Sequence, residues 1–506
     1  MTRSCFMSLP RASLLAAGNL AVFVVSAAIA GDTVPPGSDP IIPGEIMVRV
    51  PDQAALAACV NALATQFPSV STLDSIPGHG TYLIGYGLNP GQSAGDMSAA
   101  LIALTAAGTI GWGELNYAGQ ASEGRTDTLW VSQLGVGLEA YESQYAVELL
   151  GLTGARARSH GGGVMIAVLD TGIDRGHPLL ESRLRLDGAN FATPFPPDSD
   201  GGDGLDNDGD GLVDEMIGHG TFVAGLVRLV APNASILPVT VLDSDGIGTS
   251  FSVAKGLYFA VDRGAHVINM SLGSTYRSQA VEDATELATQ RGAIVIAAAG
   301  NTGQSEPREY PASDTGVLGV AATDRWDVKA PFSSFGPRIG LCAPGHSEAK
   351  AKNPKTFNPA ASIVSTLPGG GFGLWRGTSF SCGLVSGVAA LVRAQHPDWP
   401  SDTVPAGSIV DAIQTTLADT AVPIEALNPG FEGLLGDGRL DALAATLAGP
   451  VQPPLGDLDG DGAIGAGDLS ILLSAWGPCG PSCPADLNLD GLVGPADLVL
   501  LLGGWG

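Results

Sequence analysis

Three polar residues in glycine-rich surroundings have the types needed to activate a hydroxyl for attack on an amide. They lie in the segments Val168-Leu-Asp170-Thr-Gly172, Gly218-His219-Gly-Thr221 and Gly377-Thr-Ser379-Phe-Ser381. A serine hydroxyl is a poor nucleophile at neutral pH, so it needs a base to take its proton and a carboxylate to orient that base. Alone, each residue would more often be a turn, cap or structural residue. Together, Asp170, His219 and Ser379 indicate a hydrolytic triad.

The elements that must position these residues are strands of a parallel sheet. Apolar runs without strict alternation recur at 164–169, 236–242, 267–272, 294–299 and 317–321. Such runs are typical of strands buried on both faces, joined by helical crossovers. Active sites of these sheets lie at the carboxyl ends of the strands. Asp170 and Asn301 follow two of the runs and are therefore functional candidates.

The three segments resemble the signature blocks of the subtilisin-like serine proteases, in the order Asp, His, Ser. The resemblance covers residues 145–447 and includes Val267-Ile-Asn-Met-Ser-Leu-Gly273, Ala297-Ala-Ala-Gly-Asn301 and Ala343-Pro-Gly345. It implies a three-layer α/β fold with a mostly parallel sheet. It also implies a serine endopeptidase that works through an acyl-enzyme intermediate.

Further site residues are implied by the resemblance alone. Asn301 matches the side chain that donates to the charge developing on the scissile carbonyl oxygen. Two segments match those that pair with an extended peptide, Gly246-Ile-Gly248 and Ser271-Leu272-Gly273. This pairing implies protein or peptide substrates. The chain departs from the family pattern at Phe222, Phe380 and Gly383-Leu384, none of which removes a catalytic group.

The first 130 residues read as two segments that precede the catalytic domain. Residues 1–30 carry two arginines, an apolar run and a final Ala28-Ile-Ala30, the pattern of a secretory signal. No later run is long enough to span a membrane, so we expect a secreted protein. Residues 31–130 contain strand and helix patterns at 44–50, 53–66, 81–86, 96–107 and 113–117. This unit weakly resembles the family's propeptide, which blocks the cleft with its C-terminal tail.

The charge of the chain is strongly negative. Acidic residues outnumber basic ones by 51 to 24, for a net charge of -27, which argues against a nucleic-acid partner. One acidic cluster places Asp206, Asp208, Asp210 and Asp214 at positions 1, 3, 5 and 9 of a calcium-type loop, although Ile217 stands at position 12. We expect Ca²⁺ there as a structural ion, the alternative being a solvated acidic loop.

A Pro-rich linker, 448–455, leads to an internal repeat at 456–506. Positions 1, 3, 5 and 12 are Asp457, Asp459, Asp461 and Asp468 in one loop and Asp486, Asn488, Asp490 and Asp497 in the other. The repeat resembles a dockerin, which implies a small helical module with Ca²⁺-dependent folding and a cohesin-like scaffold as partner. Dockerins commonly carry hydroxyl residues at positions 10 and 11, but here these are Ala466-Gly467 and Pro495-Ala496, which leaves the partner open.

Two other functions stay open on the sequence alone. The chain could be a catalytically inactive, subtilisin-shaped binding protein displayed by its C-terminal repeat. Alternatively, the repeat could carry the main function, with the protease as its cargo. Cys479 and Cys483 are close enough in sequence to form a disulfide in an oxidising compartment.

Overall fold

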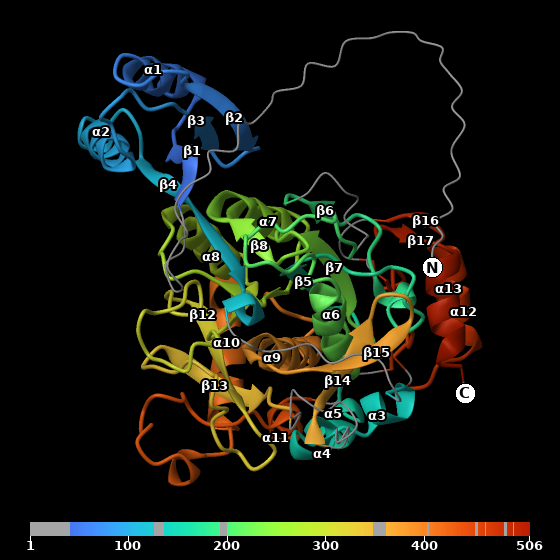
Figure 1. Ribbon diagram of the computed structural model, residues 1–506. Helices are drawn as coiled ribbons and strands as arrows, with labels where there is room; N and C mark the ends of the chain where they lie inside the picture. Colours follow the sequence, from blue (N-terminus) through green and yellow to red (C-terminus); the bar gives the residue numbers. More distant parts are fainter. Residues whose placement is uncertain are drawn as a thin grey trace, which may run out of the picture. The chain divides into compact units, whose positions relative to one another are not determined.

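The structure, a computed structural model, describes residues 41–125, 136–192, 200–347, 361–401, 404–450, 454–460, 462–479, 483–488 and 490–505 (Figure 1). The expected signal segment 1–30 and Asp461 lie outside these residues. None of the helices in the described ranges combines the length and apolar character needed to cross a bilayer.

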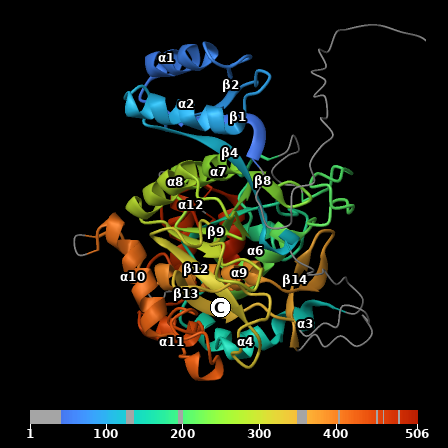
Figure 2. The ribbon, with the colours of Figure 1, turned by 60° about the vertical axis from the view of Figure 1, so that its left-hand side comes forward.

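The N-terminal unit is an antiparallel sheet covered by two helices (Figure 2). Its elements are β1 (Ile41–Arg49), α1 (Gln53–Ala64), β2 (Ser71–Ile76), β3 (Thr81–Gly85), α2 (Ala94–Ala106) and β4 (Trp112–Ala121). The strand order is β4-β1-β3-β2. Apolar side chains of both helices, among them Leu63 and Leu101, pack on Ile46 and Ile84 in a separate core. β2 was not predicted because its residues are largely exposed and lack an apolar pattern.

The central unit is built on a sheet of seven strands, each parallel to its neighbours. In spatial order these are β13 (Ile339–Pro344), β12 (Val317–Thr323), β11 (Ile294–Ala298), β9 (Val267–Met270), β5 (Met165–Asp170), β7 (Ser235–Thr240) and β6 (Ala189–Asn190). β5, β7, β9, β11 and β12 are completely buried, as expected for strands covered on both faces. The predicted parallel sheet is therefore confirmed.

Helices complete the layers around this sheet. α6 (His219–Val230) packs against α9 (Thr378–Ala394), and α7 (Ser250–Asp262) packs against α8 (Gln279–Gln290). The remaining elements are α3 (Leu138–Glu142), α4 (Tyr145–Leu149), α5 (Leu152–Arg156), β8 (Ile247–Thr249), β10 (Leu272–Gly273), β14 (Ile363–Leu367), β15 (Gly371–Trp375), α10 (Ala406–Asp419) and α11 (Ala442–Leu447). Tyr141, just before residue 145, is buried in the large core and donates to the carbonyl of Gly225.

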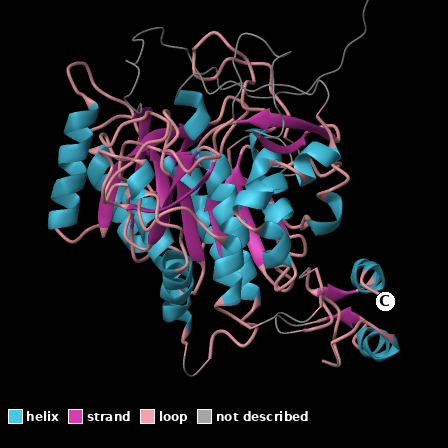
Figure 3. Cartoon of the chain, turned by 90° about the horizontal axis from the view of Figure 1, so that it is seen from below, coloured by secondary structure: helices cyan, strands magenta, loops and turns pink. Residues whose placement is uncertain are grey.

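The C-terminal unit consists of two helices and a short two-stranded ribbon (Figure 3). Its elements are α12 (Ala466–Ser474), β16 (Gly477–Pro478), β17 (Leu492–Val493) and α13 (Pro495–Gly503). Leu472 and Leu501 are buried in its core. Trp476 and Trp505, by contrast, are 47% and 44% exposed. Both follow the ends of their helices and so leave the packed face.

Candidate active site

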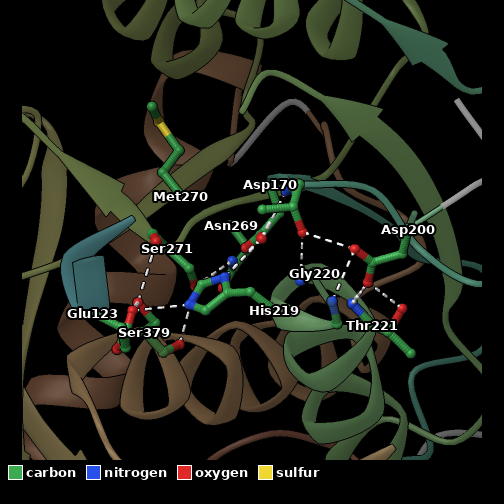
Figure 4. A network of polar contacts seen from close by, with 12 residues as sticks. Glu123, Asp170, Asp200, His219, Gly220, Thr221, Asn269, Met270, Ser271 and Ser379 are labelled. Atoms are coloured by element: carbon green, nitrogen blue, oxygen red, sulfur yellow. Dashed lines mark hydrogen bonds and ion pairs between the residues drawn. The ribbon is translucent and has the colours of Figure 1, made fainter. Parts of the chain in front are cut away.

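Three elements bring Asp170, His219 and Ser379 to one end of the parallel sheet (Figure 4). Asp170 is the last residue of β5, His219 the first of α6 and Ser379 the second of α9. Asp170 Oδ1 lies 2.7 Å from His219 Nδ1, and all three residues are buried. A glycine is required at position 220, since a Cβ there would lie 2.1 Å from the carbonyl oxygen of Gly172. The start of α6 can therefore approach the turn that follows Asp170.

A fourth residue, Glu123, lies among these groups (Figure 4). Its Oε2 accepts a hydrogen bond of 2.6 Å from Ser379 Oγ and lies 2.8 Å from His219 Nε2. The glutamate comes from the 3-10 helix Ser122–Arg125 that directly follows β4. The N-terminal unit thus places the Glu123 carboxylate against the Ser379 hydroxyl and against His219 Nε2, the imidazole nitrogen that faces away from Asp170.

Asn301 holds the other oxygen of the same carboxylate. Its Nδ2 donates to Glu123 Oε1 at 3.1 Å, and its Oδ1 accepts from the backbone N and Oγ1 of Thr378. These contacts orient the amide so that its N–H faces the centre of the site. The side chain predicted to stabilise an oxyanion therefore already binds a negative oxygen.

The electrostatics of His219 follow from its two acidic neighbours. Burial disfavours a charged imidazolium, but Asp170 and Glu123 outweigh burial and raise the pKa of His219 to about 10. With Glu123 in place, His219 is therefore protonated at neutral pH. A protonated imidazole cannot accept a proton from Ser379.

The segments expected to bind an extended peptide are paired with the chain's own β4. β4 runs antiparallel to β8, with Gly119 opposite Gly248, and antiparallel to β10, with Ala121 opposite Leu272 and Gln120 opposite Gly273. The backbone N of Ala121 also donates to the carbonyl of Gly246 at 2.8 Å. The carbonyl of Ser271 accepts from Ser379 Oγ at 3.1 Å. Four of the five predicted positions, Gly246, Gly248, Leu272 and Gly273, thus line the strand that leads to Glu123, whereas Ser271 contacts Ser379 itself.

Asp200 is a further buried carboxylate beside the site, drawn in Figure 4. It accepts from the side chain of Thr171, from the backbone N of Gly218, and from the backbone N and side chain of Thr221. Burial raises the pKa of Asp200 to about 6, although the hydrogen bonds from Thr221 and Gly218 lower it.

The acidic loop near residue 206 brings together three of its four predicted ligands. Carboxylate oxygens of Asp206, Asp208 and Asp210 lie within 4.8 Å of one another. Asp206 also accepts from the backbone N of Gly209 and Gly211, which curls the loop around it. Asp214 is not part of this group, because it accepts from the backbone N of Asp203 and Gly204 instead. Three clustered carboxylates repel one another, so this loop fits a divalent cation.

The C-terminal loops have a similar internal geometry. Asp457 accepts from the backbone N of Gly460 and Gly462, much as Asp206 does in its own loop. Oxygens of Asp457, Asp459 and Asp468 lie within 4.8 Å of one another. In the second loop Asp486 accepts from the backbone N of Asp490 and Gly491, and Asn488 donates to Asp490.

Both loops are closed in the same way. Asp468 and Asp497 each accept three backbone N–H groups, from two residues near the start of their own loop and from one glycine just before the helix. This equivalence between the two halves fits a pair of calcium loops.

Cys479 and Cys483 are free thiols in the structure.

Comparison with known proteins matches residues 161–449 to the subtilase family. The chain is 36% identical over 295 residues to subtilisin BL of Lederbergia lenta, which covers 56% of this chain and 91% of that relative. It is 35% identical over 247 residues to thermitase of Thermoactinomyces vulgaris, over 47% of this chain and 77% of thermitase.

Two solved structures are similar to the chain. A protease of Pseudoalteromonas arctica PAMC 21717 matches with a TM-score of 0.51 and 28% identity, over 59% of this chain and 94% of its own. Fervidolysin of Fervidobacterium pennivorans matches with a TM-score of 0.60 over 83% of this chain and 62% of its own. At 22% identity, fervidolysin supports the fold alone.

Proposed function

The chain belongs to the subtilase family and is a serine endopeptidase, and on this basis we propose that Ser379, His219 and Asp170 cleave peptide bonds in protein substrates. The observation that carries the proposal is the arrangement of Asp170, His219 and Asn301 around Ser379. Each supports the proposal because it supplies a group that one step of amide hydrolysis requires.

In the proposed reaction, Ser379 Oγ attacks the scissile carbonyl carbon while His219 Nε2 takes the hydroxyl proton. Asp170 holds the other imidazole nitrogen and stabilises the imidazolium that forms. The side chain of Asn301 and the backbone N of Ser379 donate to the oxyanion. His219 then gives its proton to the leaving amine. Water hydrolyses the acyl-enzyme by the same steps in reverse.

We infer that the peptide substrate binds as an added strand between β8 and β10. The support is β4, which occupies this place and pairs with both strands. Main-chain pairing of this kind accepts many sequences, so it suits a protease that acts on extended protein segments.

The test of the proposal is labelling of the processed chain with a fluorophosphonate, which reacts with an activated serine. Labelling at Ser379, together with hydrolysis of an unfolded protein, supports the peptidase. The competing function is an inactive binding protein, and it predicts no labelling after the N-terminal unit has been removed.

We further propose that residues 31–130 form a propeptide that keeps the enzyme inactive. β4 fills the strand position expected of a substrate, and Glu123 binds Ser379, His219 and Asn301 together. Removal of this segment would free the triad. Together with the secretory pattern of residues 1–30, this arrangement fits an exported zymogen.

The C-terminal unit is proposed to be a calcium-dependent, dockerin-like module. The equivalent hydrogen bonds around Asp457 and Asp486 support calcium. Leu473, Val499 and Leu502 are at least half exposed on α12 and α13, and Trp476 and Trp505 are exposed after the helix ends. Such an apolar surface favours attachment to a protein scaffold of the cohesin type. Retention of the full chain, but not of a chain ending at residue 450, on an immobilised cohesin would test this.

A further inference from the structure

Asp200 has no role in the proposed reaction, yet both of its carboxylate oxygens accept hydrogen bonds. Oδ1 accepts from Thr171 Oγ1 at 3.1 Å and from the backbone N of Gly218 at 3.0 Å. Oδ2 accepts from the backbone N and Oγ1 of Thr221, at 3.1 and 2.5 Å. The residue is buried, so these protein groups replace the water that a carboxylate would otherwise bind.

The donors to Asp200 flank two residues of the triad. Thr171 directly follows Asp170, while Gly218 and Thr221 lie on either side of His219. Thr171 Oγ1 also accepts from the backbone N of Gly220 at 3.1 Å. The Asp200 carboxylate and the Thr171 hydroxyl thus link the turn after β5 to the first turn of α6.

This first turn of α6 lacks the usual local cap. The first N–H groups of a helix have no partner within the helix, and a polar side chain at the N-cap commonly satisfies one of them. The N-cap of α6 is Gly218, which has no side chain. Asp200, eighteen positions earlier in the chain, accepts from the backbone N of Gly218 and of Thr221 instead. It therefore anchors the helix end on which His219 stands.

Asp170 depends on the same anchor. Its Oδ1 accepts from the backbone N of Thr171 and faces His219, while its buried Oδ2 has no hydrogen-bond partner among the described residues. Its orientation therefore rests on the turn at Thr171. Because a misplacement of about 1 Å in a catalytic group costs roughly 100-fold in rate, an anchor shared by both backbones should influence catalysis.

We propose that Asp200 is a positioning residue of the peptidase, which sets the distance between Asp170 and His219 through Thr171, Gly218 and Thr221. This inference rests on the proposed function of the triad. A cap that only stabilises α6 would change the melting temperature but not the rate per correctly folded site.

The first test compares Asp200→Asn with Asp441→Asn. Asp441 is a matched control because it caps α11, accepting from the backbone N of Ala444, and contacts none of the three triad residues or Asn301 in any described hydrogen bond. The full-length variants are processed, with trace wild-type enzyme where needed, and their active sites are titrated.

In Asp200→Asn the new NH₂ group cannot accept the hydrogen bonds that one carboxylate oxygen accepts, because it faces other N–H and O–H donors. We expect kcat per titrated site to fall about 10- to 100-fold with KM nearly unchanged, and fluorophosphonate labelling to slow in parallel. Asp441→Asn should keep the wild-type kcat.

The second test does not depend on the folding of Asp200→Asn. Thr171→Val removes the hydroxyl that links Asp200 to Gly220, whereas Thr171→Ser keeps it. We expect Thr171→Val to lower kcat about tenfold or more and Thr171→Ser to restore most of it. If Asp200→Asn folds, adding Thr171→Val to it should have little further effect, because the two residues act as one unit.

Unchanged kcat per titrated site in Asp200→Asn, or equal rates in Thr171→Val and Thr171→Ser, would overturn the positioning role. If the processed wild-type chain is itself inactive, the proposed peptidase function fails instead. The two failures are therefore distinguishable.

Discussion

The side chains of Glu123 and Ser379, 256 positions apart in the chain, share a hydrogen bond of 2.6 Å. The same carboxylate reaches His219 Nε2 with one oxygen and Asn301 Nδ2 with the other. Glu123 therefore occupies the three polar groups that the proposed reaction needs. A substrate carbonyl cannot reach Ser379 until this side chain leaves.

Ser379→Ala should give a folded chain without peptidase activity that retains its N-terminal unit, if the chain processes itself. The mutation removes only the hydroxyl that would serve both processing and turnover. Loss of a triad nucleophile lowers kcat by about 10⁶ in a subtilisin. Mass spectrometry of the purified variant and hydrolysis of an unfolded protein check the two expectations. Full activity in Ser379→Ala would contradict the triad.

Glu123→Gln should weaken the block of the site in the full-length chain. The substitution keeps the shape of the side chain but removes the charge that binds His219 and Ser379. Hydrogen bonds to charged groups contribute about 1.5–3 kcal/mol, so Ser379 should react about 10- to 100-fold faster with a fluorophosphonate. Glu139→Gln, on the exposed face of α3, is a control that should react at the wild-type rate.

The blocked state should weaken as the pH rises through about 10. The two carboxylates raise the pKa of His219 from its ordinary 6.5 to about 10. Glu123 contributes to this rise together with Asp170, so the ion pair between Glu123 and His219 is complete while His219 stays protonated and is lost as the pH rises through about 10. Labelling of Ser379 in the full-length chain should therefore accelerate as the pH approaches and passes about 10. In Glu123→Gln the acceleration should begin at lower pH, and identical profiles would count against the ion pair.

From the sequence we could predict those functional residues that stand in a recognisable local pattern. Asp170 and Asn301 follow buried apolar runs, and His219 and Ser379 lie in glycine-rich segments that begin helices. Glu123 carries no such mark in Ala121-Ser-Glu-Gly-Arg125, because its partners come from three other elements. In the sequence Asp200 is one more carboxylate of the Asp/Gly-rich segment that precedes His219. In the folded chain Asp200 is buried, whereas Asp206 and Asp208 are exposed, and the sequence pattern does not distinguish the three.

Asn301→Ala should lower turnover without weakening substrate binding. The side chain donates to a negative oxygen in the structure, and in the reaction this charge appears only as the bond to Ser379 forms. We expect kcat to fall by about 10²–10³, the size known for such a donor in a subtilisin, with KM nearly unchanged. Steady-state kinetics on one peptide decide the matter. A raised KM with wild-type kcat would assign Asn301 to binding.

Calcium should stabilise the chain through the loops at 206–214, 457–468 and 486–497. In each loop the carboxylate at position 1 accepts backbone N–H groups from the residues that follow, so the loop curls around that carboxylate. The C-terminal unit has a small apolar core, so its folding should depend on the ion most strongly. At a hundredfold excess over Kd, one site contributes about 2.7 kcal/mol to the free energy of unfolding.

Calorimetric titration of the full-length chain, combined with thermal melting in calcium and in chelator, measures this effect. Asp206→Ala and Asp486→Ala should each remove binding at one loop and lower the melting temperature only when calcium is present. Asp411→Ala, on the exposed face of α10, should melt as the wild type does. Circular dichroism of residues 456–506 should show a gain of helix with calcium. No gain up to millimolar calcium would refute the ligand assignment in the C-terminal loops.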